Sequence, residues 1–199
     1  MLIVGSGDGA EAAYFTAQGM AVSALDPSPE ASDLSHLGIE FRRVPLEHDP
    51  FRGRLFDLVF CYHVLEHMQH PRLALMLMYD SLAPGGLLYL GTPNRSRALG
   101  YIGSMDTTMA QKARWNLADW RSRLLGTFRN ELGAHAGFSR QELRQLALES
   151  FERVEDVTLD YMHLKYAGVP PLAVRALTFH PAVFDHVSPA VYLLCQKRR

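Results

Sequence analysis

The chain opens on Leu2-Ile3-Val4-Gly5-Ser6-Gly7-Asp8-Gly9, in which a short apolar run is followed at once by three alternating glycines. The apolar run is typical of a buried strand, and residues 10–18 have a helical pattern that ends at Gly19. Because glycine has no Cβ, the backbone of such a strand–loop–helix junction can pass very close to a ligand. The first turn of the helix adds free N–H groups. This junction predicts a ligand-binding loop on a parallel α/β sheet.

The second predicted strand ends at an acid, Asp26. Ligands of open α/β sheets bind beyond the carboxyl ends of the strands, where this carboxylate can accept hydrogen bonds from two ribose hydroxyls. The loop and the acid together predict a site for a nucleoside cofactor. Gly5, Gly7 and Ala10 also satisfy a relaxed G-x-G-x-x-A dinucleotide pattern, but Asp8 places a carboxylate where a pyrophosphate needs N–H donors. An acid there suits a cofactor with an amine-bearing tail and favours S-adenosylmethionine over NAD.

Strands and helices alternate through most of the remaining chain. Pro29, with Ser28 as its N-cap, predicts the start of a helix. Ser139 and Glu142 have the spacing of a capping box and predict the start of another. The alternation predicts βαβ units and a mostly parallel sheet. The further strands are expected at residues 21–25, 39–44, 55–61, 87–91, 154–159 and 191–195, and a helix at residues 71–83.

Two insertions interrupt what we expect to be one domain, residues 1–199. The first, residues 95–137, contains an apolar stripe at helical spacing together with several basic residues. It is either a lid that faces an acidic or aromatic acceptor or an amphipathic helix that packs Trp120 inward. The second, residues 160–188, is rich in proline, histidine and aromatic residues and is either a second acceptor wall or a homodimer contact. The stripe of the first insertion comprises Met109, Ala113, Leu117, Trp120 and Leu124.

The composition argues against several classes of protein. The 199 residues include 20 Lys+Arg and 21 Asp+Glu, and the net charge of −1 argues against a nucleic-acid partner held by a broad basic surface. Apolar residues make up 48% of the chain, enough to bury a core. Two cysteines cannot form a disulfide framework, and no apolar run reaches the roughly 20 residues of a membrane span. We therefore expect a cytoplasmic protein without a membrane span.

Four stretches carry further motifs: Val4-Gly5-Ser6-Gly7-Asp8-Gly9, Leu25-Asp26-Pro27-Ser28, Phe56-Asp57-Leu58-Val59-Phe60-Cys61 with His63-Val64-Leu65-Glu66-His67, and Leu82-Ala83-Pro84-Gly85-Gly86 with Gly91-Thr92-Pro93-Asn94. Together they resemble the class I S-adenosylmethionine-dependent methyltransferases, in particular those of the ubiquinone-biosynthesis O-methyltransferase type. The match weakens after about residue 95 and returns at residues 138–146. The resemblance implies a Rossmann-like, mostly parallel seven-stranded sheet with helices on both faces and a reversed last strand. It also implies a helical segment before the first strand, which we expect to be missing here, as in a truncated form.

The same resemblance assigns cofactor contacts residue by residue. It places the glycine loop along the cofactor, Asp26 on the ribose, and the residues after the fourth strand at the methionine end. Pro45 departs from the family, which usually has an acid at this position. The implied cofactor-binding residues are Gly5, Ser6, Gly7, Asp8, Gly9, Asp26, Pro27, Leu46, Glu47, Cys61, Tyr62 and His63.

Histidines are the candidates for acid–base chemistry. An imidazole has a pKa near neutral pH, so it can remove the proton of a hydroxyl nucleophile. The candidates are His63 and, before the helix that starts near Ser139, His135. Residues 63–67 also fit the H-x-x-E-H pattern of inverted zinc peptidases. Pro71 leaves little room for a long ligand-bearing helix, so we expect no metal.

The sequence thus predicts an S-adenosylmethionine-dependent methyltransferase. It would transfer a methyl group to a small-molecule acceptor, at a hydroxyl, by in-line displacement, with proximity and alignment as its main contributions. A non-catalytic S-adenosylmethionine-binding protein or truncated form is the second hypothesis. An NAD-dependent oxidoreductase is the third. Nucleic acid is not an expected partner.

Overall fold

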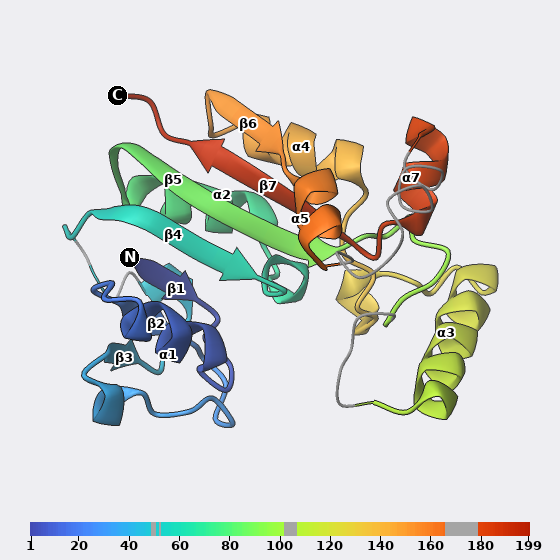
Figure 1. Ribbon diagram of the computed structural model, residues 1–199, viewed down its shortest axis with the longest axis horizontal. Coiled ribbons are helices and arrows are strands. Elements are labelled where there is room, and N and C mark those ends of the chain that lie inside the picture. The colour runs from blue at the N-terminus through green and yellow to red at the C-terminus, as the bar shows by residue number, and fades with distance from the viewer. Residues whose placement is uncertain (49–50, 52, 102–106, 166–178) are drawn as a thin grey trace.

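The computed structural model describes residues 1–48, 51, 53–101, 107–165 and 179–199, which form a seven-stranded sheet with helices around it (Figure 1). The strand order is β3-β2-β1-β4-β5-β7-β6. The strands are β1 (Leu2–Val4), β2 (Ser23–Leu25), β3 (Glu40–Arg42), β4 (Phe56–Tyr62), β5 (Leu82–Pro93), β6 (Arg153–Asp156) and β7 (Ala190–Gln196).

Strand pairing confirms a mostly parallel sheet with a reversed last strand. β1 pairs in parallel with both β2 and β4, and β4 pairs in parallel with β5. β7 is antiparallel to β5 and to β6, between which it lies. The carboxyl ends of β1, β2, β4 and β5 therefore meet at one edge of the sheet, the edge at which ligands bind in this architecture.

Helices cover both faces of the sheet. Successive side chains of a strand point to opposite faces. Leu2 and Val4 belong to the main core, together with Leu75 of α2 and Leu143 of α4. Ile3 belongs to a second core around α1. The helices are α1 (Ala10–Ala17), α2 (Pro71–Asp80), α3 (Met109–Leu124), α4 (Arg140–Leu148), α5 (Thr158–Lys165) and α7 (Pro181–Val187), with 3₁₀ turns η1 (Ser35–Leu37), η2 (Leu46–His48), η3 (Leu65–His67) and η4 (Asn130–Leu132).

The helix predicted to start at Pro29 does not form. The backbone N–H of Ser28 donates to the Asp26 carboxylate at 2.8 Å, and the guanidinium of Arg43 binds the carbonyl oxygens of Ser28 and Ala31. These side chains take the backbone groups that a helix would use, so the segment is a turn. The prediction from the Ser-Pro pair was wrong because it considered only local capping.

Two element boundaries in the structure also differ from those predicted from the sequence. α2 ends at Asp80, and Leu82 already pairs with Phe56, so β5 runs through Pro84 instead of starting at residue 87. β6 ends at Asp156, whose carboxylate accepts a hydrogen bond from the Thr158 N–H at 2.9 Å, where α5 begins. The predicted capping box of α4 is confirmed, with Ser139 and Glu142 bonded reciprocally.

The helix expected in the first insertion forms as α3, but its apolar stripe does not pack inward. Trp120 is 46% exposed, and none of the residues of α3 is buried. α3 stands apart from the sheet (Figure 1). Residues 102–106 of this insertion, and residues 166–178 of the second, lie outside the described residues.

Candidate functional site

The glycine loop lies at the carboxyl end of β1 and reaches its geometry through positive φ angles. Gly5, Gly7 and Gly9 have φ values of 77°, 50° and 85°. A Cβ on Gly5 would lie 2.1 Å from a methyl carbon of Val64, whereas a Cβ on Gly7 would meet no atom within 4 Å. Gly5 therefore allows the loop to pack against the residues after β4. Gly7 leaves the opposite side of the loop open to a ligand.

Asp26 fastens this loop to the end of β2. It is 8% exposed, and its two carboxylate oxygens accept hydrogen bonds from the N–H groups of Gly7 and Ser28, each at 2.8 Å. An ionised carboxylate offers about four lone-pair sites, so both oxygens retain capacity for a ligand hydroxyl. Asp26 thus has the position and the unused acceptor capacity that the sequence analysis assigns to it.

The other acid of the loop, Asp8, has a structural contact. Its carboxylate accepts a hydrogen bond from the Ala10 N–H at 3.1 Å, at the first turn of α1. The hydroxyl of Ser6, in contrast, is buried and has no hydrogen-bond partner among the described residues. A buried hydroxyl without a partner is costly, so Ser6 marks a place where a polar ligand group can bind.

The remaining predicted cofactor-binding residues differ in how far their side chains are exposed to solvent. Pro27 and Glu47 are exposed, and Tyr62 is half-buried with its ring against that of His63 at 4.3 Å. Burial raises the pKa of Tyr62 to about 12. The side chains of Leu46 and Cys61 lie in the main core, and burial raises the pKa of the Cys61 thiol. Only the backbone of these two residues can contact a ligand.

The candidate base His63 follows β4 and has an unusual backbone. Its φ is 55°, a left-handed value, and its N–H donates to the Gly91 carbonyl of β5 at 2.8 Å. Non-glycine residues with such angles often occur at functional sites. Its Nδ1 lies 3.5 Å from the carboxylate of Glu66, whose side chain is 1% exposed. The next residue, Val64, covers Gly5, so this segment lies beside the glycine loop.

Glu66 joins the two predicted acid–base residues. One oxygen of its carboxylate, Oε1, lies 3.5 Å from Nδ1 of His63 and 4.0 Å from Nε2 of His67. The ring of His67 in turn meets that of His135 edge to face, with centroids 4.7 Å apart. The second carboxylate oxygen of Glu66 has no hydrogen-bond partner among the described residues. Residues from two distant segments therefore meet around one buried carboxylate, which we call the histidine cluster (His63, Glu66, His67 and His135).

The electrostatics of this cluster favour a neutral imidazole at His135. Burial lowers the pKa of His135, and the neighbouring His67 lowers it further, while Glu66 opposes both effects. Glu66, His67 and His135 each offer one ligand atom, and these atoms lie within 4.8 Å of one another. Two imidazoles and a carboxylate could hold a divalent cation. The sequence analysis expects no metal, and that expectation remains a prediction.

Arg97 holds His135 in place, and the sequence analysis did not identify it. Its side chain is 4% exposed and donates to the carbonyl oxygens of Asn94, His135 and Ala136 at 3.0–3.2 Å. It also pairs with Asp119 of α3 at 2.9 Å. An arginine in a connecting segment carries no local signal of such a role. Glu66 and His67 were noticed only within the zinc-peptidase pattern.

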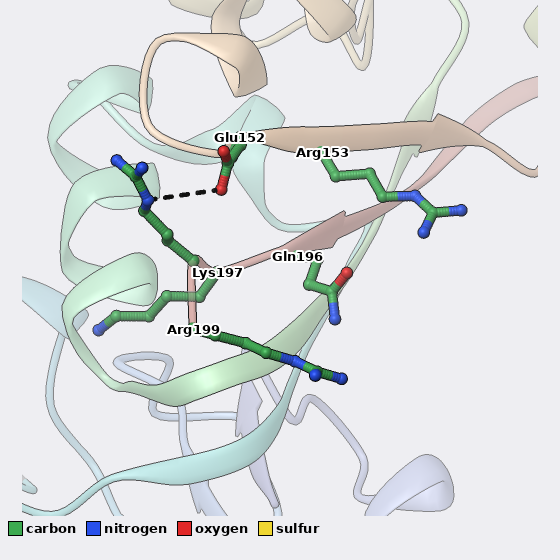
Figure 2. A pocket seen from close by; sticks show the side chains of 6 residues that line it. Glu152, Arg153, Gln196, Lys197 and Arg199 are labelled. Atoms are coloured by element: carbon green, nitrogen blue, oxygen red, sulfur yellow. Dashed lines mark ion pairs between the residues drawn. The ribbon is translucent and has the colours of Figure 1, made fainter.

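Two hollows in the surface differ in their distance from the histidine cluster. The first, of about 610 Å³, lies between the start of α2 and α4. Its lining includes Gln69, two residues after His67, and Phe138, three residues after His135. Another lies at the amino ends of the parallel strands, where β7 ends (Figure 2). It is lined by Glu152, Arg153, Gln196, Lys197, Arg198 and Arg199, and an ion pair of 3.9 Å joins Arg198 to Glu152. Its position at the opposite edge separates it from the glycine loop.

The glycine loop fits the nucleoside cofactor that the sequence predicts. The open side of Gly7, the unpartnered hydroxyl of Ser6 and the unused acceptor sites of Asp26 all occur at the carboxyl edge of the sheet. The histidine cluster lies next to them through Val64. A bound nucleoside cofactor would therefore reach the imidazoles without crossing the sheet.

Comparison with sequence families gives an independent result. A family model described as "Methyltransferase domain" matches residues 2–150, about three quarters of the chain. The match includes β1 to β5, the glycine loop, Asp26 and the histidine cluster.

Curated relatives match part of the chain. The ubiquinone biosynthesis O-methyltransferase of Nitrobacter winogradskyi is 32% identical over 114 residues, covering 52% of this chain and 43% of that protein. The tRNA U34 carboxymethyltransferase of Wolinella succinogenes is 36% identical over 78 residues, covering 36% of this chain and 28% of that protein. The chain spans less than half the length of the curated relatives that it matches.

Solved structures share the fold. The plantazolicin methyltransferase BpumL, in complex with a triazolic desmethylPZN analog and SAH, superposes with a TM-score of 0.64 at 14% identity, over 100% of this chain and 76% of that one. The [4+2]-cyclase SpnF superposes with a TM-score of 0.57 at 18% identity, over 99% of this chain and 74% of that one. At these identities the likeness concerns the fold.

Proposed function

The chain belongs to the methyltransferase-domain family, the class I S-adenosylmethionine-dependent methyltransferases, and from this premise we propose that it methylates a hydroxyl group of a small-molecule acceptor. When bound, S-adenosylmethionine supplies a methyl group on a positively charged sulfur. The observation that carries the proposal is the position of the histidine cluster. His63, the candidate base, and the buried Glu66 lie directly beside the glycine loop, where an acceptor would meet the cofactor.

Residues of the first two strand ends would hold the cofactor. The unused lone pairs of the Asp26 carboxylate would accept the ribose hydroxyls, and the Ser6 hydroxyl would gain the partner it lacks. Gly7 would present its open face to the ligand. Hydrogen bonds to a carboxylate are among the stronger ones, so Asp26 would be the main polar anchor.

The histidine cluster would handle the proton of the acceptor hydroxyl. His63 would accept that proton, and the Glu66 carboxylate 3.5 Å from its Nδ1 would orient the ring and stabilise the resulting imidazolium. A positioned general base contributes about 10²–10⁴ in rate. His135 would face the acceptor from the other side as a neutral imidazole, because burial lowers its pKa.

A non-catalytic binding protein of the same fold is the alternative. The shared fold of a protein named as a cyclase is consistent with the use of this architecture for chemistry other than methyl transfer. The histidine cluster favours catalysis, since a purely binding role gives no reason for a strained His63 beside a buried carboxylate.

The cofactor is tested by calorimetric titration with S-adenosylhomocysteine. Asp26→Ala should weaken binding by about 1.5–3 kcal/mol, tenfold or more in Kd. Asp80→Ala, a substitution at an exposed acid near the end of α2, is the matched control and should bind like the parent chain. A parent chain that does not bind S-adenosylhomocysteine would contradict the proposal, and a rise in melting temperature with NAD would favour an oxidoreductase.

The reaction is tested with labelled S-adenosylmethionine against hydroxylated aromatics, sugars and carboxylates. Methyl transfer to a hydroxylated acceptor that is lost in His63→Asn, with binding of S-adenosylhomocysteine retained, is the expected result. Tight cofactor binding without transfer to any acceptor would favour the non-catalytic alternative. Transfer at full rate by the variant would remove His63 as the base.

A further inference from the structure

The apolar stripe of α3 is open to solvent along the length of the helix. The stripe consists of Met109, Ala113, Leu117, Trp120 and Leu124, which a rotation of about 100° per residue places on one side. Met109, Leu117 and Leu124 are 79%, 65% and 89% exposed. Surface apolar residues are usually scattered singly, so a row of them on one helix marks an interaction surface.

α3 is fastened to the rest of the protein by a different side. Asn116 bonds to the backbone of Gly100 in both directions, and Asp119 pairs with Arg97. Trp120, on the flank of the stripe nearest Asn116, also contacts this part of the protein, because its indole N–H donates to the Ala98 carbonyl at 2.8 Å. These polar contacts fix the orientation of the helix and leave most of the stripe exposed. α3 itself lies beyond the carboxyl ends of β4 and β5 (Figure 1).

The outer flank of the stripe is basic. Arg114 and Arg121 are exposed and lie beside Leu117 on the side away from Asp119. Asp119 is the only acid in α3, and its carboxylate forms an ion pair with Arg97. The exposed part of α3 therefore combines leucines, a methionine and a tryptophan with two arginines, Arg114 and Arg121, for which the described part of the chain provides no ion-pair partner.

We propose that α3 docks this protein on the surface of an anionic lipid bilayer, with the stripe in the interface and the two arginines at the headgroups. A helix with a cationic flank and an apolar face that includes tryptophan and leucine lies in the membrane plane. Each arginine near an anionic surface adds attraction. Within the described part of the chain, no helix is both long enough and apolar enough to cross the bilayer, so the helix rests on it.

A second copy of the chain fits the stripe less well. An antiparallel helix pair centred on Leu117 would bring Arg114 of one copy against Arg121 of the other. Like charges at such a contact are destabilising. An anionic bilayer accommodates both features, because its acyl chains take up the apolar stripe and its headgroups bind the arginines. The proposal does not depend on which reaction the protein catalyses.

The chain provides its own probe, because its two tryptophans, Trp115 and Trp120, both lie on α3. Vesicles of phosphatidylcholine with an equal amount of phosphatidylglycerol should pellet the protein and shift its tryptophan emission to the blue. Vesicles of phosphatidylcholine alone should bind it more weakly. Quenching by brominated lipids should place the indole of Trp120, the tryptophan of the stripe, at the interface of the bound native protein, whereas Trp115, whose ring packs on Tyr101, should be quenched less.

Paired variants test the surface. Leu117→Glu with Leu124→Glu should lower partitioning by about tenfold or more, because two apolar contacts are replaced by repelled charges. Arg114→Gln with Arg121→Gln should lower it by about fivefold per arginine. Met76→Glu, which alters an exposed apolar residue on α2, is the control and should behave as the parent chain.

Three results would overturn the proposal. One is a parent chain that stays in the supernatant with the mixed vesicles and shows no emission shift. The second is pelleting of the Leu117→Glu, Leu124→Glu variant as strong as that of the parent. The third is a parent chain that sediments as a dimer without vesicles while this variant is a monomer, since the stripe would then be covered by a second copy.

Discussion

The imidazole rings of His67 and His135 meet edge to face, with centroids 4.7 Å apart and planes at 82°. His67 lies in the turn after β4, and His135 lies in the segment between η4 and α4. Their contact closes the space around Glu66 from two distant parts of the chain. The candidate site therefore depends on how the α3–α4 region is held against the carboxyl ends of the strands.

The stability of the protein should fall at mildly acidic pH because of His135. Burial lowers the pKa of this histidine below that of the unfolded chain, so the unfolded state binds more protons as the pH falls from about 6.5. The stabilising contribution is complete above about pH 6.5 and is lost as the pH falls through the lowered pKa. Urea unfolding at a series of pH values measures this loss.

His135→Asn serves as the comparison, because it removes the titrating group and keeps a polar side chain. The difference in unfolding free energy between the parent and this variant should shrink toward acidic pH. A difference that stays constant between neutral and acidic pH would show that the pKa of His135 is the same in the folded and unfolded chains.

Gly5→Ala should destabilise the fold more than Gly7→Ala. Both residues have positive φ, which costs a non-glycine residue about 1–2 kcal/mol. Only Gly5 also faces Val64, where a new methyl would add about 1–3 kcal/mol of overpacking. Chemical denaturation of both variants measures the two free energies of unfolding.

The source of the extra cost at Gly5 can be separated with Val64→Ala. If the clash is responsible, the double variant should lose less stability than the sum of the two single variants. Equal losses for Gly5→Ala and Gly7→Ala would contradict the close packing of the glycine loop against the segment after β4.

Arg97→Ala should lower the free energy of unfolding by about 3–5 kcal/mol, because it removes the cation paired with Asp119 and the side-chain donor of the His135 and Ala136 carbonyl oxygens. Arg95→Ala is a matched substitution in the same segment, at a side chain that is 36% exposed and paired with Glu142, and should cost far less. Thermal and chemical unfolding of the two variants check the ranking. A loss at Arg97 no larger than at Arg95 would rule out this role.

His63→Asn should reduce kcat by about 10²–10⁴ if His63 accepts the proton of the acceptor. Binding of S-adenosylhomocysteine should change little, because the proposed polar anchor of the cofactor is Asp26. Steady-state rates with saturating cofactor, beside calorimetric titration, separate the two effects. His48→Asn is a suitable control, since this exposed histidine lies on η2, away from the cluster.

The order and type of most elements follow from local sequence. The apolar run before Gly5 predicted β1, Ser139 and Glu142 predicted the start of α4, and the alternation of strands and helices predicted the parallel sheet. Such signals act over a few residues, through capping, backbone angles and hydrophobic spacing. The turn at Ser28 escaped prediction because Arg43, from beyond the next strand, takes its carbonyl oxygen.

The sequence by itself therefore determined the fold class, the glycine loop and the acid at the end of β2, because their signals are carried by neighbouring residues. Only the tertiary structure decided that His63 and His135 share the buried carboxylate of Glu66, that Arg97 supports His135, and that the stripe of α3 faces outward. The physical reason is distance along the chain. These contacts join segments whose approach depends on the packing of the whole sheet edge, and no pattern within one segment encodes them.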